Sequence, residues 1–141
     1  MKITNSYLKK YVKKEFNIDV DIKIIKRVRI NGVTYAGYAE RINNKKIIRL
    51  AQKHCHRKSL LWHEVGHLKV GFDKNPSENE YMAQMWAIHD SWKKGYNRIF
   101  EELIYDTYYV WKDCKDPIYA RARTIILDEC KKRYELEIKH E

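Results

Sequence analysis

The sequence contains few of the residues that interrupt regular structure or cross-link a chain. Its 141 residues include five glycines, two prolines and three cysteines. The cysteines at positions 55, 114 and 130 are scattered and odd in number, which excludes a disulfide framework. No apolar run approaches the roughly 20 residues of a membrane span, and residues 1–16 lack the apolar stretch of a signal peptide. We therefore expect a cytoplasmic protein without membrane segments, folded as a single domain over residues 1–141.

Acidic residues are scarce in the first part of the chain. Residues 1–58 carry 16 Lys and Arg against 4 Asp and Glu, whereas residues 59–141 carry 13 against 15. A basic half can attract nucleic acid or another polyanion. A Lys-rich solvated surface is the simpler interpretation, because no nucleic-acid-binding motif accompanies the charge. Nucleic acid therefore stays open as a partner.

Hydrophobic periodicity predicts one helix and then three strands in the first third of the chain. Apolar residues at helical spacing lead up to Phe16, after a cap at Ser6. Residues 20–51 alternate with a period near two, and Asn31-Gly32 and Asn43-Asn44 are turn signals within them. We expect these residues to form a small antiparallel three-stranded meander.

The rest of the sequence predicts helices, which cover about residues 57–70, 77–95, 96–112 and 117–137. Gly71 stops the first of them, and Pro76 directly precedes the second. Asp116-Pro117 combines a capping residue with proline at the first helical position, which starts the last helix. Strands followed by helices indicate an α+β fold, in which the meander packs against the first two of these helices and additional C-terminal helices follow.

The stretch HEVGH, residues 63–67, has the spacing of a metal site. His63 and His67 lie one helical turn apart on one face, where two imidazoles can bind one ion. Glu64 lies beside the pair and can reach a bound water. A catalytic zinc ion also needs a third protein ligand and an open position.

The loop after this helix indicates where the third ligand lies. Residues 71–76 separate the two helices, and His67 and Glu80 are equidistant from the middle of this loop. Residues equidistant from the turn of an antiparallel helical hairpin lie at the same level, so Glu80 is level with His67 and Gln84 with His63. Ala83 shares that face of the second helix and lets the two helices approach closely. The predicted ligands are therefore His63, His67 and Glu80.

Two alternatives compete with Glu80 as the third ligand. Ser77 and Glu80 have the spacing of a capping box, in which Glu80 would bond the backbone at Ser77 and leave Glu78 as a weaker ligand candidate. Asp73 lies six residues past His67, where metzincin-like enzymes place a third ligand after a glycine turn. Here the glycine comes one place late, at Gly71.

HEVGH followed by SENEYMAQMWA resembles the gluzincin zinc metallopeptidases, whose second helix carries the third ligand as Glu-x-x-Ala before small or aromatic residues. Glu80, Ala83, Gln84, Trp86 and Ala87 match that pattern. The strongest resemblance is to the soluble archaeal minigluzincins, and the chain is also similar to the phage-type repressor-cleaving and radiation-response peptidases. The resemblance covers about residues 50–95. Many gluzincins have an acidic residue or asparagine at the position of Gln84, whose carbonyl oxygen can still orient His63.

This resemblance and ordinary zinc chemistry predict a zinc-dependent endopeptidase. The ion would lower the pKa of a bound water towards about 7, and Glu64 would act as the general base and return the proton to the leaving amine. A second electrophile normally helps to polarise the carbonyl. Tyr96, His89 and Arg98 are three candidates that the sequence does not separate.

Three further sequence features bear on the predicted site. A peptide or protein substrate is expected to add a strand to the sheet edge, for which KKIIRLA, residues 45–51, is the expected edge; its basic residues also suit edge protection. HCH, residues 54–56, cannot easily converge on one ion and is interpreted as loop histidines. The tail, residues 135–141, carries His140 and glutamates that can reach the zinc, and small gluzincins of this kind are similar to latent enzymes, or zymogens; a frayed terminus is the simpler interpretation.

Two other functions remain open from the sequence. The chain can be a non-catalytic regulatory protein that retains a zincin-like site and binds DNA or a partner through its basic half. It can also be a site-specific protease of the phage type with a repressor as its only substrate.

Overall fold

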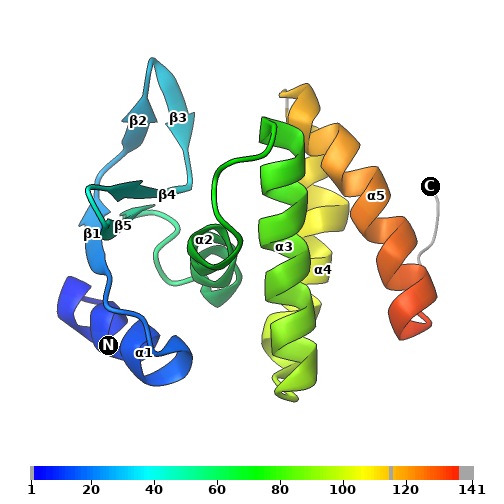
Figure 1. The fold of residues 1–141 in the computed structure, drawn as a ribbon, viewed down its shortest axis with the longest axis horizontal. Coiled ribbons are helices and arrows are strands. Elements are labelled where there is room, and N and C mark those ends of the chain that lie inside the picture. The colour runs from blue at the N-terminus through cyan, green and yellow to red at the C-terminus, as the bar shows by residue number, and fades with distance from the viewer. Residues whose placement is uncertain (1, 115, 137–141) are drawn as a thin grey trace.

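A computed structural model describes residues 2–114 and 116–136. Figure 1 shows the strands and the first helix on one side, α2 in the middle and α3, α4 and α5 on the other side. The elements are α1 (Asn5–Phe16), β1 (Asp21–Ile25), β2 (Val28–Ile30), β3 (Val33–Tyr35), β4 (Gly37–Ile42), β5 (Lys45–Ala51), α2 (Lys58–Val70), α3 (Pro76–Lys93), α4 (Asn97–Tyr105), a π-helical turn (Asp106–Val110), a 3-10 turn (Trp111–Asp113) and α5 (Pro117–Tyr134). The α+β prediction is confirmed.

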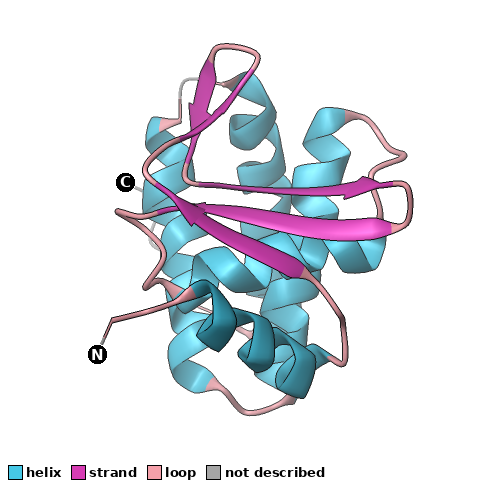
Figure 2. Cartoon of the chain, turned by 90° about the vertical axis from the view of Figure 1, so that its left-hand side faces the viewer, coloured by secondary structure: helices cyan, strands magenta, loops and turns pink. Residues whose placement is uncertain are grey.

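The predicted antiparallel meander is wrong. The three-stranded sheet has the order β1-β5-β4, with β1 parallel and β4 antiparallel to β5, and β2 and β3 form a separate hairpin that projects from the sheet (Figure 2). Each of the first two expected strands is interrupted, at Lys26-Arg27 and at Ala36. β5 carries Ile47, Ile48 and Leu50, which are all buried. This apolar strand takes the central position because only there are both of its edges paired.

The predicted turns and helix ends are largely confirmed. Asn31 and Gly32 both have positive φ angles, as do Asn43 and Asn44, which is the geometry of type I′ hairpin turns. α2 ends at Gly71, whose φ of 90° a residue with a side chain rarely adopts. The expected Ser6 cap is wrong, because Thr4 caps α1 by accepting a hydrogen bond from the Tyr7 amide.

The third expected helix is irregular in its second half. α4 is followed by π-helical and 3-10 turns. The carbonyl oxygen of Leu103 accepts hydrogen bonds from two side chains, the amide of Gln84 on α3 and the hydroxyl of Thr107. Side chains that compete for backbone carbonyls are a usual cause of such irregularity.

Helix α2 is buried on almost all sides. The sheet covers one face and α3 covers the opposite face, so nine of its residues are buried although its sequence is only weakly amphipathic. Trp62 is fully buried, with its ring centroid 4.8 Å from that of Phe16 on α1. The histidines of HEVGH therefore lie in the interior of the molecule. Within the described ranges, none of the helices combines the length and apolar character needed to cross a membrane.

Candidate metal centre

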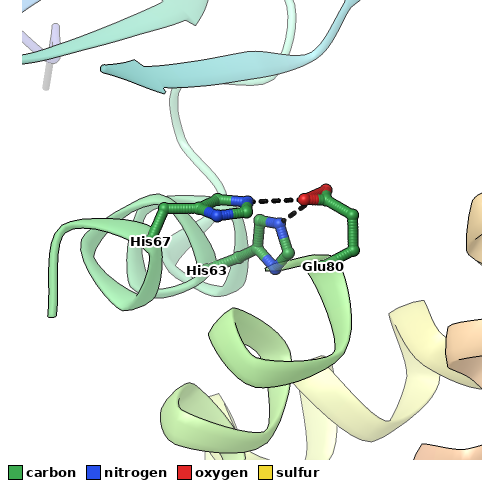
Figure 3. A group of neighbouring side chains, drawn as sticks. All are labelled: His63, His67 and Glu80. Atoms are coloured by element: carbon green, nitrogen blue, oxygen red, sulfur yellow. Dashed lines mark hydrogen bonds and ion pairs between the residues drawn. The ribbon is translucent and has the colours of Figure 1, made fainter. Parts of the chain in front are cut away.

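Three potential metal ligands converge between α2 and α3. The Nε2 atom of His67 lies 2.7 Å from Oε2 of Glu80, and the Nε2 atom of His63 lies 3.3 Å from Oε1 of the same carboxylate. Figure 3 shows the two imidazole rings and the carboxylate turned towards one another. The three ligand atoms lie within 4.8 Å of one another, close enough to hold one metal ion. The structure thus brings together the three residues that the sequence predicts as ligands.

The close approach of the two helices depends on Gly66. A Cβ atom at this position would lie 2.4 Å from the carbonyl oxygen of Ala83, closer than real Cβ contacts allow. Ala83 lies at this helix contact, as predicted, and is fully buried. This contact determines how far His63 and His67 are from Glu80.

Gln84 orients His63. Its Oε1 atom lies 2.7 Å from Nδ1 of His63. Because an amide oxygen only accepts hydrogen bonds, Nδ1 carries the hydrogen and Nε2 is the atom that faces Glu80. The amide nitrogen of Gln84 donates to Thr107 Oγ1 at 2.9 Å and to the Leu103 carbonyl at 3.2 Å. All the polar atoms of the buried Gln84 side chain are therefore satisfied, and its amide is fixed in one orientation.

The alternative ligands are engaged elsewhere or lie apart from the group. Asn75 caps α3, accepting from the Glu78 amide at 2.9 Å and donating to the Glu78 carboxylate at 2.6 Å. Ser77 donates to the carbonyl oxygen of Ile118. The alternative capping box of Ser77 and Glu80 is thus not formed: Asn75 caps the helix, and the Glu80 carboxylate faces His63 and His67 instead. Asp73 is exposed and does not belong to the ligand group found among the described residues.

The two histidines are held by different contacts. The ring of His67 stacks on Phe72, with centroids 5.9 Å apart. The ring of His63 packs edge-on against Trp111 at 5.7 Å. Together with the Gln84 hydrogen bond, these aromatic contacts restrict the rotamers of both imidazoles.

The charges in the group are strongly coupled. Burial alone would lower the pKa of His63, but the hydrogen bond to Glu80 and the charges of Glu80 and Glu64 outweigh burial and raise it to about 9. Burial alone would raise the pKa of Glu80, but its hydrogen bonds to His63 and His67 and their charges lower it well below its usual range. In the metal-free protein this is an imidazolium–carboxylate pair, and a bound cation can replace the proton.

The first turn of α2 is anchored by acidic residues from the neighbouring helical segment. Arg57 precedes the helix and provides no side-chain cap. Instead, Glu102 on α4 accepts a hydrogen bond from the Ser59 amide at 3.1 Å. Asp106 accepts from the Ser59 hydroxyl at 2.6 Å and pairs with the Arg57 guanidinium at 2.5 Å. Two carboxylates at a helix N-terminus also interact favourably with the helix dipole.

Glu64 lies where the start of β4 crosses α2. A Cβ atom at Gly37 would be 2.9 Å from Oε2 of Glu64 and 3.1 Å from Cδ1 of Leu60. Burial raises the pKa of Glu64, an effect that the two histidines partly offset. A cleft of about 510 Å³ opens here, lined by the start of β4, by the three metal-ligand candidates and by Glu64. A carboxylate with a raised pKa beside a metal-binding group has the character of a general base.

The sequence did not identify Tyr119, one of the three tyrosines that line this cleft. None of the three predicted electrophile candidates lines the cleft: Tyr96 donates to Glu15, His89 bonds Tyr134, and Arg98 lies outside the lining. Tyr119, in the first turn of α5, lines the cleft and packs against Trp111 at 5.1 Å. Burial raises the pKa of its hydroxyl, and the charges of Glu80 and Glu64 and a hydrogen bond to Glu80 raise it further. The sequence predicted that a helix starts at Asp116-Pro117. It did not predict which part of the molecule this helix packs against.

Three other expectations have a structural outcome. Residues 45–51 were expected to form the sheet edge, which is wrong because β5 is central; β4 is the edge strand beside the cleft. His54, Cys55 and His56 lie in a turn, as predicted, and are not part of the ligand group found in the described ranges. Cys55, Cys114 and Cys130 are free thiols, which confirms the expected lack of disulfides. His140 and the rest of residues 137–141 lie outside the described residues, so neither the frayed terminus nor the alternative contact of the tail with zinc is tested.

Comparison with protein-family models, with curated proteins and with solved structures gives no match. The family resemblance therefore stays a prediction, and the chemistry of the site alone indicates a function.

Proposed function

We propose that the protein is a zinc-dependent endopeptidase of the gluzincin type. The observation that carries this proposal is the convergence of His63, His67 and Glu80 beside a fourth residue, Glu64, at an open cleft. Two imidazoles and one carboxylate are one of the ligand sets of catalytic zinc sites, which keep one position open, whereas structural zinc sites are closed and rich in cysteine.

The ligand atoms fit a zinc ion chemically. His63 presents Nε2 because Gln84 holds its Nδ1, and the ligand atoms of His63, His67 and Glu80 lie within 4.8 Å of one another. A zinc ion bound here would supply a Lewis acid that strengthens water as a nucleophile and polarises a peptide carbonyl.

Glu64 and Tyr119 are the proposed catalytic residues of the chain itself. Glu64 would take a proton from the attacking water and deliver it to the amine of the leaving peptide. The hydroxyl of Tyr119 would donate a hydrogen bond to the carbonyl oxygen as negative charge develops there. Its raised pKa keeps this hydroxyl protonated and able to donate.

The proposed peptide substrate would lie along β4. This strand pairs with β5 on one side only, so its other edge offers backbone groups to an added strand. Gly37 brings this edge directly over Glu64. A peptide bound in this way would present its carbonyl groups close to the general base.

Metal analysis and a single substitution test the proposal. Protein purified from metal-replete medium should contain one zinc ion per chain by plasma mass spectrometry, and zinc should be lost from the His63→Ala variant. Glu64→Gln should keep its zinc and lose cleavage of unfolded casein by at least about 100-fold. Absence of stoichiometric zinc, or cleavage that Glu64→Gln leaves unchanged, would reject the proposal. Stoichiometric zinc without cleavage of any protein tested would favour the non-catalytic alternative.

A further inference from the structure

A basic hollow adjoins the cleft at one end of the sheet. We use this term for the pocket of about 640 Å³ around Lys26, Arg27 and Lys53, which none of the acidic residues in the described ranges lines. Tyr35, Ala36 and His54 line both this hollow and the metal-centre cleft. The two concavities are therefore continuous across the start of β4.

The sheet topology brings these basic residues together. β1 and β5 are parallel and end side by side, with Ile25 opposite Ala51 and with the Gln52 amide donating to the Ile25 carbonyl at 2.7 Å. Lys26 and Arg27 follow the end of β1, and Lys53 follows the end of β5. On the other side, the Ala51 amide donates to the carbonyl of Ala36, just before β4. In an antiparallel meander, the middle strand would separate the end of the first strand from the end of the third.

The cations of the hollow are not neutralised by the protein. In residues 2–114 and 116–136, no carboxylate pairs with Lys26, Arg27 or Lys53, whereas other basic residues of the sheet do have partners: Lys45 pairs with Asp21 and Arg49 with Glu40. The positive field extends to His54, whose pKa is lowered first by burial and then by the charges of Lys53, Arg57 and His56. Exposed, unpaired cations at the end of a cleft attract an anionic group.

We propose that the basic hollow binds an acidic side chain of the substrate, so that the protein prefers peptides with Asp or Glu on the side of the scissile bond that lies over the start of β4. This inference rests on the proposed peptidase function. Glu64 lies beside Gly37, and Ala36 and Tyr35 are the next residues towards the hollow. At roughly 3.3 Å per residue of extended chain, the acidic side chain is expected about two to four residues from the scissile bond.

The placement of charge favours a peptide over a nucleic acid. The other dense group of basic residues, on α1, lies at the opposite end of the strand side of the molecule from the β2–β3 hairpin (Figure 1). The two groups therefore do not form one continuous track for a phosphate backbone. In contrast, the basic hollow shares Tyr35, Ala36 and His54 with the cleft that contains Glu64, where a peptide would bind. Arg27 can also hold a carboxylate through two parallel hydrogen bonds.

A binding experiment tests the hollow independently of catalysis. The probes are two fluorescein-labelled twelve-residue peptides that differ only in three consecutive Glu or Gln residues, measured by anisotropy with zinc-loaded Glu64→Gln protein. We expect the Glu peptide to bind roughly fivefold more tightly at low salt. Adding Arg27→Gln and Lys53→Gln should abolish this preference. The matched control is Lys9→Gln with Lys10→Gln, which removes the same charge from exposed positions of α1 and should keep the preference.

Charge reversal makes the result specific. With Arg27→Glu and Lys53→Glu, a peptide with three consecutive Lys residues should bind more tightly than the Glu peptide. Equal affinity for the Glu and Gln peptides, or a preference that both double variants lose alike, would overturn the inference. Tighter binding of a twelve-nucleotide single-stranded DNA that depends on Arg27 and Lys53 would overturn it in favour of nucleic acid. If the acidic preference is found but the active protein cleaves no peptide, the peptidase proposal fails while the anionic binding site stands.

Discussion

Gly66 on α2 lies against the backbone of Ala83 on α3 so closely that a Cβ atom at Gly66 would be 2.4 Å from the Ala83 carbonyl oxygen. Gly66 is the fourth residue of HEVGH, between the two histidines that face Glu80. The glycine that lets the helices touch therefore lies inside the motif that supplies the metal ligands.

We predict that Gly66→Ala separates α2 from α3 and weakens metal binding. The added methyl group meets backbone atoms, which cannot move away as a flexible side chain can, so the free energy of unfolding should fall by about 1–3 kcal/mol. Urea denaturation and competition with a zinc chelator measure the two effects. Ala83→Gly should not rescue the variant, since the clash is with the backbone of Ala83. Unchanged stability and zinc affinity would show that this contact does not set the helix distance.

Gly37→Ala should affect catalysis without affecting the metal. Here the added methyl group would meet the ends of two side chains, Glu64 and Leu60. Both can shift, so the fold should tolerate the change while Glu64 is displaced from its position. Because small displacements of a reacting group are costly, we expect kcat/KM for peptide cleavage to fall about 10- to 100-fold. A normal zinc content with normal kcat/KM would contradict the proposed position of Glu64.

Gln84→Met should lower zinc affinity about 10-fold or more, because it removes the acceptor that holds Nδ1 of His63 at 2.7 Å. Thr107→Val leaves the acceptor of His63 in place and removes one partner of the Gln84 amide together with the bond from Thr107 to the Leu103 carbonyl, so its effect on zinc affinity should be smaller. Zinc affinities from chelator competition give the order of the two variants. An equal affinity for Gln84→Met and wild type would exclude Gln84 as the residue that orients His63.

Glu102→Ala should destabilise the protein by about 1 kcal/mol, since it removes the carboxylate that caps α2 at the Ser59 amide. Glu101→Ala is the matched control, because Glu101 is the adjacent exposed residue on the same helix. Chemical denaturation measures the free energy of unfolding of both variants. Each variant loses one negative charge, but only Glu102→Ala also loses the cap. Equal destabilisation by both substitutions would argue against capping by Glu102.

The stability of the metal-free protein should decrease as the pH rises. The pKa of His63 is about 9 in the folded protein, above the value of about 6.5 expected in the unfolded chain. The protonated form is therefore favoured by folding, and its contribution is fully present below about pH 6.5 and lost as the pH rises through about 9. We expect a loss of at most about 3 kcal/mol over this window, measured by urea denaturation.

Zinc should remove this pH dependence. A metal ion binds the neutral imidazole, so zinc-loaded protein no longer depends on protonation of His63, and zinc affinity should rise over the same window. At each pH, the free energy of unfolding of the metal-free protein is compared with that of the zinc-loaded protein. Groups remote from the site titrate alike in both forms, so their effect cancels in the difference. Parallel pH profiles for the two forms would contradict the raised pKa of His63.

Much of the candidate site could be predicted from the sequence because it is local in the chain. His63, His67, Glu80 and Gln84 lie on two consecutive helices joined by a short loop. Helical periodicity and the position of the loop are enough to place them at matching levels. The same reasoning considered only Ser77 as the start of a capping box in α3, because its hydroxyl can accept a bond from the first turn. The structure decides for Asn75.

The sequence by itself determined the α+β class, the turns, the helix ends and the metal-ligand group, since each follows from propensity and periodicity over a few residues. Tertiary structure decided which strands pair, that β4 is the edge over Glu64, that Tyr119 lines the cleft and that Glu102 reaches α2 from a distant segment. These features depend on which apolar surfaces pack together, and no local pattern encodes that choice. The parallel pairing of β1 with β5 is the clearest example, because it alone brings Lys26 and Arg27 next to Lys53 at the end of the cleft.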